Sequence, residues 1–314
     1  MARFAHLKAL LFFVCLLAFA PANAQTPAPT PTVVLPTSEQ PRLATAKSSL
    51  YCAGYIQHER LPQMPEIVGA EEEQEQRKFS DGDIVYLNAG SQQGIKEGQT
   101  FQIIRPRGDV KGVHKTKAGF IGTYVQDVGQ LQVFKVREHT SAAQITFSCD
   151  MILFGDLLAP IPDRAVPSER AEGSLDRFAD PSGKQNGRLM MAKDGREMIT
   201  RHDIVYIDLG SEDQIKPGDH LTIYRPLGTG NITRIDNEES GRRRSNGFQS
   251  DRFRGGGFST QASSTSKQAK HERPSMPRKI VGEMVVIDVQ TRTATAIITR
   301  IASEVHTGDW VEIQ

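Results

Sequence analysis

An internal repeat constrains the fold of this chain more than any other feature of its sequence. Residues 83–108 (DIVYLNAGSQQGIKEGQTFQIIRPRG) align without a gap with residues 203–228 (DIVYIDLGSEDQIKPGDHLTIYRPLG), and 13 of the 26 positions are identical. That offset is 120. A second block repeats at an offset of 153, with VGQLQVFKV beginning at Val128 and VGEMVVIDV at Val281. Two copies of one structural unit are therefore expected, and the larger second offset places an insertion inside the second copy.

Both copies alternate glycine turns with short runs rich in β-branched and aromatic residues, such as IVYL after Asp83 and IVYI after Asp203. Glycine permits the positive φ that reverses the chain. Runs of this composition favour strands, and no helical period lies between them. The sequence therefore predicts an all-β protein of two tandem small antiparallel, SH3-like β-barrel repeats. His202 replaces the glycine of one turn, so that turn should be built differently.

The insertion is the one outlier in composition. Residues 241–270 contain no Leu, Ile or Val, so they cannot bury enough apolar surface to offset their ordering entropy. We expect a disordered, basic loop. The predicted segments are a signal peptide at 1–24, a Pro/Thr-rich linker at 25–47, a first repeat at 48–160, a linker at 161–187, and a second repeat at 188–314 with the insertion at 229–279.

The first residues have the pattern of a secretory signal peptide. Arg3 and Lys8 precede a short apolar run, which ends in small residues before an expected cleavage between Ala24 and Gln25. The apolar run is too short to span a bilayer, and no longer one follows. The sequence thus predicts an exported protein, periplasmic or associated with the outer membrane and at most peripheral to a membrane.

Two cysteines lie beyond the predicted cleavage site, Cys52 and Cys149. An exported chain with an even number of cysteines can form one disulfide, and an oxidising compartment favours it. The alternative is two unconnected, buried cysteines that pack as small apolar residues. Spacing alone does not decide between them; the prediction carried forward is the disulfide.

No enzyme signature emerges from the sequence. The histidines have no metal-ligand spacing, and neither a G-x-S-x-G elbow nor a phosphate-binding loop is present. The run from Asp208 to Ser211 weakly resembles an aspartic protease loop, but the other copy has Asn88 in place of the second carboxylate that this mechanism needs. We therefore predict no catalytic residues, no metal and no cofactor.

The candidate binding residues are arginines. Arg105 and Arg225 occupy the same position of the repeat and precede proline, which indicates a strand end with a solvated side chain; the alternative is a pair that grips carboxylate or phosphate groups. Tyr86 and Tyr206 should close a barrel layer with their hydroxyls at the rim. The insertion adds Arg242, Arg243, Arg244, Arg252 and Arg254.

Those insertion arginines resemble an arginine–glycine nucleic-acid segment, but the predicted export argues against a nucleic-acid partner. An anionic envelope surface would be attracted by the same charge, since residues 229–279 carry a net charge of +6. The other interpretation is a solvated loop without a ligand.

The repeated pattern DIVY-x3-GS…IK-x-G…RP-x-G resembles the C-terminal domain of the flagellar assembly protein T family. It is also similar to repeats in bacterial envelope proteins that carry LysM modules. The resemblance implies small β-barrels attached to larger envelope assemblies, without an enzymatic role. We expect a binding or scaffolding module whose partners are envelope proteins or an anionic cell-wall polymer. Alternatives are a peptidoglycan- or polysaccharide-binding protein and, third, an enzyme with an unrecognised site.

Overall fold

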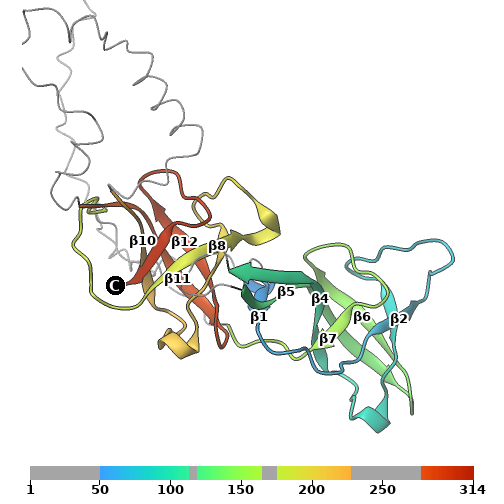
Figure 1. The fold of residues 1–314 in the computed structure, drawn as a ribbon. Helices are drawn as coiled ribbons and strands as arrows, with labels where there is room; N and C mark the ends of the chain where they lie inside the picture. The colour runs from blue at the N-terminus through green and yellow to red at the C-terminus, as the bar shows by residue number, and fades with distance from the viewer. Residues whose placement is uncertain (1–49, 113–118, 165–174, 228–276) are drawn as a thin grey trace, which may run out of the picture. The chain divides into compact units, whose positions relative to one another are not determined.

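The computed structural model describes residues 50–112, 119–164, 175–227 and 277–314, all of which belong to one compact unit (Figure 1). Antiparallel strands dominate these residues. The first copy contains β1 (Tyr55–Gln57), β2 (Ile67–Ala70), β3 (Ile84–Leu87), β4 (Thr100–Gly112), β5 (Gly119–Val136), β6 (Ser141–Ser148) and β7 (Leu157–Ala159). The second contains β8 (Asn186–Ala192), β9 (Ile204–Ile207), β10 (His220–Pro226), β11 (Arg278–Val289), β12 (Ala294–Ile301) and β13 (Trp310–Ile313). Short 3-10 helices are η1 (Ser91–Gln93), η3 (Lys193–Gly195) and η4 (Ser211–Asp213).

The second copy is a closed six-stranded antiparallel barrel in the order β10-β11-β12-β9-β8-β13. The first copy is a sheet in the order β2-β3-β6-β5-β4-β7, with β1 added against β5. Read around the barrel from β8, the two orders are the same. In the first copy an isolated bridge between Glu66 and Leu157 connects the ends of the sheet beside β2 and β7. The prediction of an all-β chain is therefore confirmed, with a closed barrel in the second copy.

The two copies also share their register residue by residue. Val85 pairs with Ala143 in the first copy, and the equivalent residues, Val205 and Ala296, pair in the second. Both copies have a register shift directly after the repeated isoleucine, Ile103 or Ile223. Identical shifts at identical positions show that the sequence repeat is a structural repeat of strand pairing.

Each copy has its own apolar core, built from the inward-facing residues of these strands. Val85 and Leu87 of β3 point into the first core, as Val205 and Ile207 of β9 do into the second. Successive side chains of a strand point to opposite faces, so alternate residues of these predicted strands enter the cores.

Two glycines of the second copy are required for different reasons. Gly218 has φ +90° with open space around it, so only its backbone conformation demands glycine. Gly210 has an extended backbone, but an added Cβ would lie 2.5 Å from the carbonyl oxygen of Thr291. Gly98, at the position equivalent to Gly218, has φ +81°, which confirms the predicted glycine turns.

Gly218→Ala should therefore cost about 1–2 kcal/mol of the free energy of unfolding, the usual penalty of a left-handed backbone. Gly210→Ala should cost about 3 kcal/mol or more, because the obstructing atoms are backbone that must move. Urea denaturation of the two variants checks this order. Equal losses would contradict the assignment of distinct roles.

Several predictions need correction. His202 adopts the same left-handed conformation (φ 70°) as the glycine it replaces, so the turn is not built differently. The proline after Arg105 does not end its strand, since β4 continues to Gly112. Tyr206 is fully buried rather than at a rim, whereas Tyr86 is 41% exposed. The second repeat starts with β8 at Asn186, and the last two residues of the predicted insertion belong to β11.

Cys52 and Cys149 form a disulfide with their Cα atoms 5.6 Å apart, which confirms that the pair lies at bonding distance. The bond joins the segment before β1 to the end of β6. Such a pair fits an oxidising compartment. The predicted signal peptide, its cleavage site after Ala24 and most of the insertion lie outside the described residues.

Candidate functional site

Arg105 and Arg225, the predicted binding residues within the described part of the chain, form equivalent ion pairs. Arg105 donates from Nε and Nη2 to the two carboxylate oxygens of Asp156, at 2.6 and 2.7 Å. Arg225 makes the same bidentate contact with Asp309, at 2.5 and 2.8 Å. Arg242, Arg243, Arg244, Arg252 and Arg254 lie outside the described residues, so the structure does not bring them together with this pair.

These ion pairs hold the turn that precedes the last strand of each copy. Arg105 also donates to the carbonyl of Met151, and Asp156 accepts from the backbone N–H of Leu153. Hydrogen bonding to the carboxylate raises the pKa of both arginines. The Arg105 side chain is only 14% exposed. The guanidinium groups are therefore committed to the fold, a role the expectation of solvated side chains missed.

A third apolar cluster joins the two copies. From the first copy it takes residues before and within β1 and β5, and from the second copy the outer faces of β9, β11 and β12. Its fully or nearly buried members are Leu50, Ala53, Ile56, Ile121, Tyr124, Ile204, Tyr206, Val285, Ile287 and Ile297. Outer-face residues of the closed barrel in the second copy are thus buried in an apolar cluster between the two copies.

Hydroxyl groups of the second copy bind the backbone of the covering segment, residues 53–56. Tyr206 donates to the carbonyl of Ala53 at 2.6 Å. Thr293 donates to the carbonyl of Ile56 at 2.6 Å, and Thr295 to the carbonyl of Gly54 at 3.1 Å. Because these carbonyls are buried, each hydroxyl satisfies an acceptor that would otherwise be costly. The segment is therefore recognised through its backbone as well as its apolar side chains.

A buried ionic group completes the contact between the copies. Arg164, from the linker between them, donates to Asp127 of β5 at 2.6 Å and lies 3.4 Å from Asp288 of β11. Asp127 also accepts from the backbone N–H of Gly54 at 2.8 Å. Burial lowers the pKa of Arg164, but the two carboxylates outweigh it and raise the pKa. Sequence reasoning missed this group; the one available signal was an aspartate inside an apolar strand.

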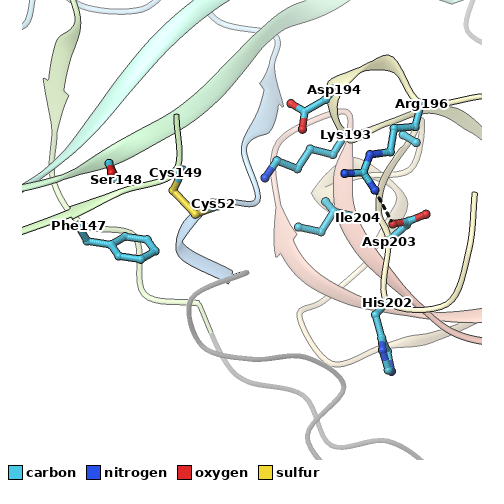
Figure 2. A pocket seen from close by; sticks show the side chains of 11 residues that line it. Cys52, Phe147, Ser148, Cys149, Lys193, Asp194, Arg196, His202, Asp203 and Ile204 are labelled. Atoms are coloured by element: carbon cyan, nitrogen blue, oxygen red, sulfur yellow. Dashed lines mark hydrogen bonds and ion pairs between the residues drawn. A yellow bond between two sulfur atoms is a disulfide. The ribbon is translucent and has the colours of Figure 1, made fainter. Parts of the chain in front are cut away.

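An open cavity of about 490 Å³ lies beside the disulfide (Figure 2). Lys193 and Asp194 of η3 line it, together with the ion pair between Arg196 and Asp203 at 3.4 Å. Figure 2 shows Lys193 extending from its loop into the space next to the disulfide. Ammonium, guanidinium and carboxylate groups thus surround a cavity that suits a polar segment better than an apolar ligand.

Tyrosines of the contact between the copies should make the protein sensitive to alkaline pH. Burial raises the pKa of Tyr55 to about 12, and also raises those of Tyr124 and, strongly, Tyr206. In the unfolded chain these hydroxyls have a pKa of about 10, so folding keeps them protonated to a higher pH. This contributes stability that is fully present below pH 10 and is lost as pH rises toward and through 12. Urea denaturation at pH 8 and pH 11 should show the loss.

Tyr206→Phe is the control for this effect. It removes the most strongly shifted group, so the loss between pH 8 and pH 11 should be smaller than in the unmodified protein. The same pH dependence in both proteins would contradict the assignment to the buried tyrosines.

No family model matches this chain, and no curated protein matches it. Among the described residues, no set of three or more His, Cys, Asp or Glu side chains could hold a metal ion. No helix in that part of the chain has both the length and the apolar character needed to cross a membrane. The function is therefore inferred from the fold and from the contact between the copies.

Proposed function

We propose that the protein is a non-enzymatic, exported protein of the cell envelope that acts as a binding or scaffolding module of a periplasmic or outer-membrane-associated assembly. In this proposal the two repeats are SH3-like barrels of one design. The observation that carries it is the contact between them, in which an apolar cluster, three hydroxyl donors and Arg164 hold the copies to each other. A scaffold needs such a fixed relation between its modules.

The disulfide supports the exported location. A bond between Cys52 and Cys149 persists in an oxidising compartment and is rare in the cytosol. The basic insertion supports a place at the envelope, because its arginines would be attracted to anionic surfaces there. In this proposal the arginines 242–244, 252 and 254 strengthen attachment and are not needed for folding.

Crosslinking of the tagged full-length protein in its native envelope tests the proposal. We expect the protein in the periplasmic or outer-membrane fraction, with the cysteines oxidised and with crosslinks to other envelope proteins. A cytosolic fraction with free thiols would overturn the location. Retention on purified peptidoglycan, with no protein crosslinks, would replace the scaffold with the alternative of a cell-wall polymer-binding protein.

A further inference from the structure

The face that repeat 2 buries against residues 53–56 is exposed in repeat 1. The shared register makes Ile84, Tyr86 and Phe134 the equivalents of Ile204, Tyr206 and Ile287. Tyr86 and Phe134 are 41% and 50% exposed, whereas their equivalents are buried. Repeat 1 thus presents an apolar surface of the kind that repeat 2 covers with an extended segment of chain.

The exposed face also keeps hydrogen-bond donors that bind this segment in repeat 2. Tyr86 stands where Tyr206 donates to the carbonyl of Ala53, and Thr140 stands where Thr293 donates to the carbonyl of Ile56. The third donor, Thr295, is replaced by alanine. In repeat 2 these two hydroxyls bind carbonyls three residues apart on one extended segment, which favours an extended polypeptide as the occupant in repeat 1.

These residues line a groove with a cavity volume of about 500 Å³. Ile84, Tyr86, Phe134 and Thr140 all contribute to its wall. The groove therefore coincides with the positions that hold residues 53–56 in repeat 2. The structure itself supplies the precedent for what covers such a face.

Charge specifies the occupant further. Lys135 is the equivalent of Asp288, which in repeat 2 faces the incoming Arg164. Because Lys135 is positive where Asp288 is negative, the segment that binds repeat 1 should have a carboxylate at the place of the Arg164 guanidinium. Lys135 lies 3.7 Å from Glu97, but both side chains are more than half exposed, so this pair is weak and exchangeable.

We propose that this groove of repeat 1 binds an extended segment of another envelope protein, with small and aliphatic side chains and an acidic residue opposite Lys135. The hydroxyls of Tyr86 and Thr140 donate to backbone carbonyls of the segment, and Phe134 packs against its aliphatic side chains. The inference rests on the proposed binding function and names the class of partner and the surface that it uses.

Two synthetic peptides test the inference on the oxidised, full-length mature chain. Both have the sequence of residues 50–57 with serine in place of Cys52; one is preceded by aspartates and the other by lysines. Fluorescence anisotropy should show the acidic peptide binding about tenfold more tightly, the equivalent of about 1.4 kcal/mol. Lys135→Glu should invert this preference, which an effect on folding alone would not do.

Single variants locate the binding site. Tyr86→Phe and Thr140→Val each remove one hydroxyl and should weaken the acidic peptide about fivefold. Met198→Glu is the matched control, because Met198 is an exposed apolar residue (82%) on a different strand connection. The Met198→Glu variant should bind the acidic peptide as tightly as the unmodified protein does. A photoreactive residue at position 134 should capture the peptide, and one at position 178 should not.

Other results would overturn the inference. These are no binding of either peptide, equal binding of both, capture only from repeat 2, or self-association of the chain that Phe134→Glu abolishes, which would make the occupant a second copy. Envelope crosslinks that map to other surfaces would leave the proposed scaffold role intact while removing this groove from it.

Discussion

Replacing Cys52 and Cys149 with serine should lower the free energy of unfolding by about 4–5 kcal/mol, because the disulfide closes a loop with a sequence separation of 97 residues. A crosslink over such a distance removes much of the conformational freedom of the unfolded chain. The bond also fixes the segment whose carbonyls accept from Tyr206 and two threonines. Urea denaturation of the oxidised protein and the double variant measures the loss.

Ala302 offers a matched control, since it occupies the position of repeat 2 that Cys149 occupies in repeat 1. Both residues donate their backbone N–H to the valine that begins the repeated VG block. Ala302→Ser introduces the same side chain as Cys149→Ser but breaks no crosslink, so its stability should stay close to that of the parent. A double cysteine variant that is as stable as this control would contradict the prediction.

Arg164→Leu should destabilise the protein by about 3–5 kcal/mol, the usual cost of leaving one member of a buried ion pair without its partner. The side chains of Arg164 and Asp127 are 2% and 0% exposed, so water cannot replace the lost contact. Since burial already raises the pKa of Asp127, the deficit should shrink as pH falls and the carboxyl becomes protonated. Chemical denaturation at pH 7 and pH 4.5 measures both effects.

Arg107→Leu is the control for this substitution. Arg107 lies 3.3 Å from Asp150, with side chains 45% and 38% exposed, and such a surface pair contributes about 1 kcal/mol or less. A second variant, Arg164→Leu combined with Asp127→Asn, should recover part of the loss because it removes the unpaired charge. Equal losses from Arg164→Leu and Arg107→Leu would show that the buried pair is not needed.

Local patterns were sufficient for much of the fold. Runs rich in β-branched and aromatic residues predict the strands that contain Val85 and Val205, and the structure places both side chains in the cores. The left-handed turn at Gly218 follows from a conformation that glycine adopts without strain. Both signals act within a few residues, so they can be read without knowing what lies across the molecule. His202 shows the limit of this signal, because its backbone adopts the left-handed turn conformation although the residue is not glycine.

The candidate sites depended on distant partners. Arg105 and Arg225 were predicted as equivalent residues, but their aspartate partners lie 51 and 84 positions away in the sequence. Arg164 gave no signal at all, because it lies in a proline-rich linker and its carboxylate partners come from two different copies. Side-chain pairing over such separations is decided by packing and cannot be derived from spacing.

The sequence by itself determined that this protein is a duplicated β structure with glycine turns. That Cys52 and Cys149 lie at bonding distance was decided by the tertiary structure. Only the tertiary structure decided what each copy does with the same residues. Tyr86 and Tyr206 occupy one position of one repeat, yet the first is exposed and the second is buried with its hydroxyl on a carbonyl. The physical reason is that burial of an outer face is set by the segment that covers it. Residues 50–56 cover repeat 2 and leave the equivalent face of repeat 1 open.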